Sequence, residues 1–313
     1  MLSELRKLPD DVLDFDDATA QVSATVEISL FSALAKHLQL LGSKYTGMDT
    51  NSSVVAHSVR ADLTPALGKL GDSRITKWIP DCDLGRLNTE VLEEIDIAMD
   101  RFLPSCEDPT GVMISDILAY IIAQVSGRLF VGTELCRNSD YLECAVKFSL
   151  EVMTAGAAVN KVRPWLRPLL ARRLPKVKLL RDRLSAAMNI LAPVIRQRKE
   201  AEKDPSWEKP NDMMQWMLAR SDESLEKLTN RQLSLTFAAI HTTSSTATNV
   251  LYSLAARPEY ISDLQEELHD VLAQNDGILS VTALQQLLKL DSFMREVSLR
   301  YPMVFSKSLS RIK

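Results

Sequence analysis

Glycine and aromatic side chains are scarce in this chain. Glycine supplies only 10 of the 313 residues and aromatic residues supply 6%, whereas glycine alone usually accounts for about 7%. Tight turns and phosphate-cradling loops depend on glycine, so its scarcity disfavours β-sandwiches, barrels and Gly-rich nucleotide-binding folds. Apolar residues still make up 46% of the chain, as in folded globular proteins, and aliphatic side chains must fill most of the core.

An excess of one charge and a long apolar run are also missing. Lys and Arg total 37 and Asp and Glu total 41, giving a net charge of −4 at pH 7. That balance provides neither the basic footprint of a nucleic-acid-binding protein nor an acidic tail. The longest apolar stretch, 112–125, contains Asp116 and is shorter than the roughly 20 residues that a membrane span needs. The sequence therefore predicts no nucleic-acid partner and no transmembrane span.

Cysteine and histidine are few, and neither forms a metal-binding pattern. The four cysteines are Cys82, Cys106, Cys136 and Cys144, with no C-x-x-C pair, and no H-E-x-x-H motif occurs. This spacing disfavours a zinc site or a disulfide framework and favours a reducing compartment. We therefore expect no bound metal and a cytoplasmic location.

The hydrophobic periodicity is helical along most of the chain. Within 88–103, Val91, Ile95 and Ala98 lie on one stripe of a helix. We therefore predict an all-α fold in a single domain over residues 1–313. The same reasoning predicts helices at 88–103, 112–130, 139–155, 176–202, 213–220, 225–256, 260–274, 281–288 and 291–300.

Prolines and polar residues mark the boundaries between these helices. The segment RPWLRP at 163–168 contains two prolines, which remove backbone donors and disrupt a helix interior, so it predicts a turn. Asp-Pro-Thr at 108–110 resembles a helix start, and Asn211 with Asp212 is expected to cap the helix at 213–220.

Small and hydroxyl-bearing residues are concentrated in the middle of the long helix predicted at 225–256. Residues 237–249 read FAAIHTTSSTATN. Serine and threonine are mediocre helix formers, so the cluster needs an explanation. The helix either passes a ligand cavity, where small residues leave room, or packs closely against other helices through these residues.

This segment resembles the long distal helix of the haem-thiolate monooxygenases, the cytochromes P450. The family pattern there is [AG]-G-x-[DE]-T-[TS], and residues 238–243 read AAIHTT. The resemblance implies a helical fold like the central part of a cytochrome P450, and Cys136 belongs to one of its structural segments. Further segments resemble the fungal branch in the same order: VRADLTP at 59–65, VGTELCR at 131–137, RPWLRP at 163–168, PNDMMQW at 210–216 and LDSFMRE at 290–296.

Several family features are missing. The family carries its thiolate ligand in a C-terminal loop, F-x-x-G-x-x-x-C-x-G, but no cysteine follows Cys144 here. We therefore expect a haem-less relative that needs no cofactor and also lacks the N-terminal anchor and first sheet region.

The E-x-x-R motif is interrupted, because Arg300 lies four residues after Glu296; one extra residue rotates a side chain by about 100° around a helix. His241 occupies the acidic position of the distal motif.

Three functional hypotheses remain open for such a chain. The first is a haem-independent cyclase that folds a hydrophobic, terpenoid-like substrate for an intramolecular [4+2] cycloaddition of the Diels–Alder type. Orientation and hydrogen-bond donors suffice for that reaction, and the absence of a D-D-x-x-D motif disfavours an ionising terpene synthase. The second is a fragment or inactive form of a fungal monooxygenase, and the third is a non-catalytic binding or partner protein of a biosynthetic pathway.

The predicted catalytic residues lie in the 237–249 segment. His241 and Thr242 are candidate donors to a substrate carbonyl, and Phe237, Ala238 and Ser245 are expected to line the substrate because helical spacing places them on nearby stripes. The alternative is a histidine satisfied in the core and hydroxyls that bond their own helix.

Three further residues take their expected roles from the resemblance. It implies that Arg60 lies on the helix near the haem propionates, where it would hold a substrate carboxylate; the alternative is a surface salt bridge. Tyr45 corresponds to a loop that closes over substrate. Trp165, among several arginines, is either a peripheral membrane contact or a packed residue in a solvated basic turn. Association into a homodimer is also expected.

Overall fold

The structure, a computed structural model, describes residues 86–105, 110–220 and 223–301. These residues form helices joined by turns and contain no β-strand, so the all-α prediction is confirmed for them. The α-helices are α6 (Arg86–Phe102), α7 (Ile114–Phe130), α8 (Thr133–Cys136), α9 (Ser139–Asn160), α10 (Arg167–Leu170), α11 (Pro175–Ala201), α12 (Met213–Arg220), α13 (Leu225–Ala256), α14 (Glu259–Gln274), α15 (Val281–Gln286) and α16 (Leu288–Arg300).

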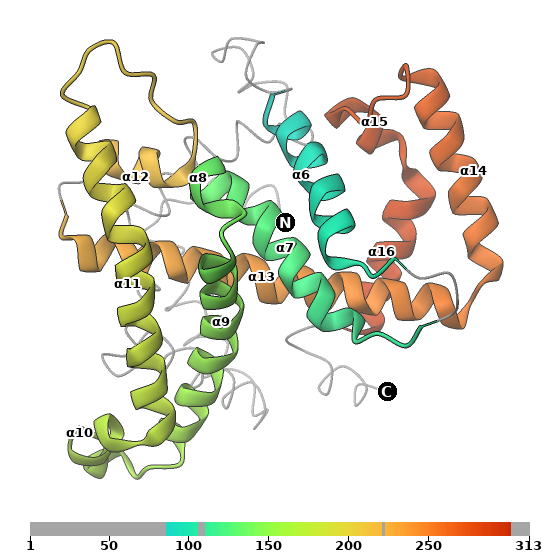
Figure 1. Cartoon of the computed structure of the whole chain (residues 1–313). Coiled ribbons are helices and arrows are strands. Elements are labelled where there is room, and N and C mark those ends of the chain that lie inside the picture. The colour runs from blue at the N-terminus through green and yellow to red at the C-terminus, as the bar shows by residue number, and fades with distance from the viewer. Residues whose placement is uncertain (1–85, 106–109, 221–222, 302–313) are drawn as a thin grey trace, which may run out of the picture.

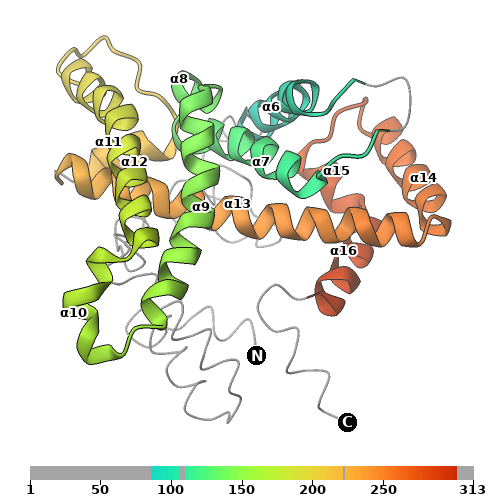
Figure 2. The same cartoon turned by 60° about the horizontal axis from the view of Figure 1, so that its bottom comes forward.

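Helix α13 is the longest of the described helices, and α7, α9, α11 and α16 pack against it (Figure 1). Ser224 caps its N-terminus, because the Ser224 side chain accepts a hydrogen bond from the backbone N–H of Lys227 at 3.4 Å. The helix ends before Pro258, since proline cannot continue the hydrogen-bonding ladder. Helices α7, α9 and α11 contact α13, and α9 and α11 cross it side by side (Figure 2). This arrangement brings α7 and α9, which are distant in sequence from α13, to the polar middle of that helix.

A buried ion pair fixes the corner where α7, α8 and α12 meet. Arg198 on α11 donates to both carboxylate oxygens of Asp212, at 2.7 and 2.8 Å, and each side chain is only 2% exposed. Asp212 also accepts the backbone N–H of Gln215 at 2.9 Å, which confirms it as the predicted cap of α12. Gly132, at φ +75°, passes so close that an added Cβ would lie 2.5 Å from Asp212 Oδ2. Glycine is therefore required at this corner.

The predicted turn at 163–168 is confirmed and is built from single helical turns. A 3₁₀ turn at Pro164–Leu166 leads into α10, and a second 3₁₀ turn at Ala171–Arg173 leads into α11. Trp165 is 69% exposed, so the expectation of a packed tryptophan is wrong. Contact with a membrane surface stays a prediction.

The helices α14, α15 and α16 form a smaller unit beside the end of α13 (Figure 1). Its own core has three buried apolar residues, Val271, Ala283 and Leu287. The carboxylate of Glu267 accepts the backbone N–H of Lys289 at 2.6 Å, which ties α14 to the start of α16. This unit therefore depends on few buried contacts.

Most predicted helix boundaries agree with the structure. The bounds of α12 and α13 match their predictions at both ends. The expected start at 108–110 is wrong where it can be checked, because Thr110 lies outside any helix and α7 begins at Ile114; Asp108 and Pro109 lie outside the described residues. No helix in the described part of the chain combines the length and apolarity that crossing a membrane requires.

Candidate functional site

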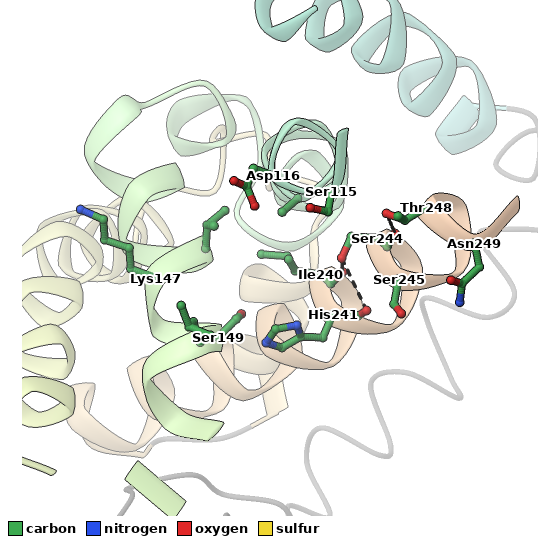
Figure 3. Close-up of a pocket in the computed structure, with 13 residues that line it drawn as sticks. Ser115, Asp116, Lys147, Ser149, Ile240, His241, Ser244, Ser245, Thr248 and Asn249 are labelled. Carbon is green, nitrogen blue, oxygen red and sulfur yellow. Dashed lines mark hydrogen bonds between the residues drawn. The ribbon is translucent and has the colours of Figure 1, made fainter. Parts of the chain in front are cut away.

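A cavity of about 360 Å³ lies between α7, α9 and the middle of α13 (Figure 3). All three helices contribute polar side chains to its wall, so a ligand would meet hydrogen-bonding groups as well as apolar surface. The lining residues are Ser115, Asp116 and Ala119 from α7, Val146, Lys147, Ser149 and Leu150 from α9, and Ile240, His241, Ser244, Ser245, Thr248 and Asn249 from α13.

His241 is a polar group of this wall with unused hydrogen-bonding capacity. Its Nε2 atom is buried and has no hydrogen-bond partner among the described residues. The ring of Phe237, one turn earlier, packs edge-on against the imidazole with centroids 5.3 Å apart and an interplanar angle of 79°. Burying an unpaired polar nitrogen costs stability, and a ligand that bonds Nε2 would offset that cost.

The hydroxyls of α13 mostly bond their own helix. Ser244 donates to the carbonyl of Ile240 at 2.6 Å, and Thr248 donates to the carbonyl of Ser244 at 2.7 Å. Thr242 and Thr246 make the same type of bond outside the cavity wall. The two explanations of the hydroxyl cluster therefore both apply: the helix borders a cavity, and its hydroxyls bond back to the preceding turn.

The structure brings together two of the predicted α13 residues at this cavity, His241 and Ser245, and packs Phe237 against the first of them. It does not bring Thr242 or Ala238 to the wall. Both are exposed and lie on the next stripe of the helix, where the Thr242 hydroxyl donates to the Ala238 carbonyl at 2.7 Å. A donor role for Thr242 therefore has no support from this cavity.

Arg60 and Tyr45 lie outside the described residues, so their expected substrate contacts stay predictions.

The contributions of α7 and α9 to the wall were not predicted from the sequence. Ser115, Asp116, Lys147 and Ser149 come from these helices, and Figure 3 shows them across the cavity from α13. A signal existed for one of them, since Asp116 interrupts the longest apolar stretch of the chain. The other three lie in ordinary helical patterns, and only packing reveals their position.

The two described cysteines do not fit the role of a haem thiolate ligand. Cys136 and Cys144 are buried and do not line the cavity. Burial raises the pKa of each thiol to about 11, which keeps it protonated, whereas iron is bound by the thiolate. The expected core role of Cys136 agrees with this placement. No cluster of metal-ligating side chains occurs among the residues that the structure covers.

The interrupted E-x-x-R motif still forms an ion pair. Arg300 Nε lies 2.7 Å from Glu296 Oε1, and the two side chains are 52% and 56% exposed. The changed spacing allows this pair, because side chains four residues apart are also neighbours on a helix.

Comparisons with known proteins establish the class to which this chain belongs. The family model described as Cytochrome P450 matches residues 82–312. The chain therefore belongs to the cytochrome P450 family.

Three similar relatives are fungal proteins. Cytochrome P450 monooxygenase TES1 of Alternaria alternata is 31% identical, over 100% of this chain and 52% of the relative. Cytochrome P450 monooxygenase ATR3 of Stachybotrys chlorohalonatus is 32% identical over 88% of the chain and 55% of the relative. Cytochrome P450 monooxygenase braC of Annulohypoxylon truncatum is 34% identical over 80% of the chain and 48% of the relative. The chain spans about half the length of the curated relatives it matches.

Proposed function

We propose that this chain is a haem-independent cyclase that folds a hydrophobic, terpenoid-like substrate for an intramolecular cycloaddition. The observation that carries the proposal is the cavity between α7, α9 and α13, which His241 lines; the Nε2 atom of this residue is buried and has no hydrogen-bond partner among the described residues. A cavity of about 360 Å³ lies within the range of small-molecule sites, which combine apolar walls with a few polar groups. Membership of the cytochrome P450 family is consistent with a site for a hydrophobic metabolite.

The proposed cycloaddition requires a substrate held in the reactive orientation and one hydrogen bond to it. In a [4+2] cycloaddition, a diene and an alkene of the same molecule form two carbon–carbon σ bonds, and three π bonds become one. No atom leaves, and no oxidant, reductant or proton transfer is needed. The cavity walls hold the substrate in the folded conformer, which removes much of the entropic barrier.

His241 supplies the hydrogen bond in this mechanism. With the proton on Nε2, it donates to a carbonyl conjugated to the alkene and stabilises the negative charge that develops on the oxygen. The edge contact with Phe237 holds the imidazole in place for this role.

A second candidate is the central part of a fungal monooxygenase. Two observations favour it: the relatives above are named as monooxygenases, and the chain spans about half of each. In that case the thiolate ligand and the oxygen chemistry would come from residues other than Cys136 and Cys144.

One experiment separates these candidates. The full chain is incubated without oxygen, haem or nicotinamide cofactor with a polyene terpenoid that carries a conjugated carbonyl, and the rate is compared with buffer. A rate above buffer supports the cyclase. Equal rates, from a chain that has secondary structure but exposes dye-accessible apolar surface, support a fragment of a monooxygenase. Binding without conversion by a cooperatively folded chain leaves a binding protein.

A further inference from the structure

We infer that the substrate is a long linear molecule with a carboxylate at one end, which Arg257 binds while the chain runs along α13 into the cavity at His241. The inference rests on the proposed function, because it assumes that this cavity takes a hydrophobic small molecule. It adds the length of that molecule and the charge of its far end.

A second cavity continues the first one along α13. Its volume is about 270 Å³, and it lies between the C-terminal part of α13 and α16. Asn249 lines both cavities and follows His241 and Ser245 at intervals of four residues (Figure 3). Residues at this spacing share one face of a helix. The two cavities therefore adjoin at Asn249 on one face of α13, and together they form what we call the α13 groove.

The α13 groove is long compared with either cavity. From His241 to Arg257 the chain advances sixteen residues, which corresponds to about 24 Å along the axis of a helix. A compact ligand fills the cavity at His241 alone, whereas a ligand that contacts both ends of the groove needs an extended chain. The reacting part of such a substrate folds in the cavity at His241, and the remainder lies in the second cavity.

The wall of the second cavity is more apolar than polar away from its charged end. Aromatic and aliphatic side chains provide this surface: Tyr252, Ala256, Phe293, Val297 and Tyr301. Tyr252 and Tyr301 are 58% and 55% exposed, so a chain lying against them would remove apolar surface from water, which favours binding. Asn249 and Ser253 are the uncharged polar residues of the wall. A hydrocarbon chain therefore fits this part of the groove.

The far end of the α13 groove carries one positive charge in excess. Three charged side chains line the second cavity, and two of them, Glu296 and Arg300, pair with each other at 2.7 Å. For the guanidinium of Arg257, the described part of the chain provides no ion pair and no hydrogen bond. A neighbouring cavity of about 520 Å³ shares Arg257 and adds one cation, Lys289, and one anion, Asp263, so the excess remains. A carboxylate balances it, and guanidinium groups bind carboxylates through paired N–H donors.

The test measures the affinity of three linear isoprenoids for the full chain by isothermal titration calorimetry, with no turnover required. Geranylgeranoic acid has twenty carbons and a carboxylate, geranylgeraniol has the same chain without the charge, and geranic acid has the carboxylate on ten carbons. We expect the long acid to bind about three- to fivefold more tightly than the alcohol, because an exposed ion pair contributes modestly. It should bind at least about tenfold more tightly than geranic acid, because each buried CH₂ strengthens binding.

Two substitutions separate the two features. Arg257→Gln should abolish the preference for the long acid over the alcohol, and in the unmodified chain that preference should weaken at high salt. Asn249→Trp fills the junction of the two cavities and should remove the advantage of the long acid over geranic acid.

Arg196→Gln and Ala255→Trp are the matched controls. Both residues are exposed, and neither lines the α13 groove, so both preferences should persist in these variants. Circular dichroism and urea titration of each variant confirm that it folds like the unmodified chain.

Equal affinity of the long acid and the alcohol, or of the two acids, overturns the inference, and the rate assay then decides the cyclase separately. Preferences that survive Arg257→Gln and Asn249→Trp also overturn it, because the ligand then lies elsewhere. Both preferences, lost in these variants but without cyclisation of any substrate, support a carboxylate-binding groove and remove the cyclase. Failure of all three isoprenoids to bind overturns the inference.

Discussion

His241 is the residue on which the proposed chemistry depends most. Its Nε2 atom is buried and has no hydrogen-bond partner in the part of the chain that the structure describes, which costs stability in the absence of a ligand. Residues kept for binding or catalysis commonly lower the stability of the fold in this way. A substitution that removes the nitrogen should therefore affect catalysis and stability in opposite directions.

The variant His241→Leu tests that opposition. Product formation should fall about tenfold, which corresponds to roughly 1.4 kcal/mol of lost transition-state stabilisation, since a cycloaddition develops only modest charge. The free energy of unfolding should stay the same or rise by about 1 kcal/mol, because an unsatisfied buried group is removed. Single-turnover kinetics and urea titrations measure the two quantities. A large drop in stability with an unchanged rate would assign His241 to the core alone.

Gly132 is the residue whose substitution should damage the fold most directly. Its φ of +75° is strained for any residue with a Cβ, and the added atom would displace Asp212 from Arg198. Disrupting a buried ion pair typically costs about 3–5 kcal/mol, so Gly132→Ala should destabilise by at least about 3 kcal/mol.

Gly111→Ala is the control for this substitution, because a Cβ there meets nothing within 4 Å. Urea titration of both variants gives the comparison, and equal stability of the two would contradict the assigned role of Gly132.

At the scale of helices, the docking of α6 depends on a buried carboxylate. Glu94 is 1% exposed and accepts hydrogen bonds from Arg137 at 2.8 Å and from Gln124 at 2.6 Å. Burial alone would raise the pKa of Glu94, but the hydrogen bonds from Arg137 and Gln124 outweigh it and hold the pKa below its ordinary 4.5. The ionised carboxylate therefore joins α6 to α7 and to the end of α8.

The lowered pKa of Glu94 predicts a loss of stability in acid. A carboxyl group whose pKa falls on folding contributes fully above its unfolded pKa, and the contribution disappears as the pH falls through the folded value. Glu94→Gln should destabilise by about 1–3 kcal/mol at pH 7, and the difference from the unmodified chain should shrink below about pH 4. The exposed Glu93→Gln is the control. Denaturant titrations at several pH values provide the measurement, and a difference that does not change with pH would refute this assignment.

The unit formed by α14, α15 and α16 should open more readily than the rest of the described helices. Its core has three buried apolar residues, whereas α9 and α13 contribute to two larger clusters. Regions with few buried contacts open at lower free energy. Amides of α14 and α15 should therefore exchange with deuterium on the order of a hundredfold faster than those of α9. Equal protection in native-state exchange would show that the unit is held by contacts of comparable strength.

The helices were largely predictable because their signals are local. Asn211-Asp212 and Ser224 mark the starts of α12 and α13 through short-range caps, and the predicted bounds agree. The start of α7 was not predictable in the same way, because Asp-Pro-Thr at 108–110 has the composition of a cap but α7 begins at Ile114.

The cavity was predictable only on the α13 side. His241 and Ser245 are one turn apart on that helix, and the sequence places them together. Ser149 and Ser115 reach the cavity through the packing of α9 and α7 on α13, and no local pattern encodes that contact. Thr242 illustrates the opposite case, since a single step along the helix turns its hydroxyl away from the wall.

For the whole molecule, we propose that this member of the cytochrome P450 family uses the cavity between α7, α9 and α13 for a reaction that needs no haem. The expected homodimer and cytoplasmic location stay predictions beside it. The reaction would require the folded chain, because α7, α9 and the distant α13 must pack together to build the cavity wall.

The most direct measurement is the stereoisomer ratio of the cyclised product formed without oxygen and without haem. The full chain, its His241→Leu and Thr246→Val variants and the heat-unfolded chain are each given the same polyene terpenoid with a conjugated carbonyl. We expect one dominant isomer with the unmodified chain and with Thr246→Val, slower formation with His241→Leu, and the ratio of the uncatalysed reaction after unfolding. An isomer ratio and rate identical to those in buffer for every folded sample would contradict a haem-independent cyclase.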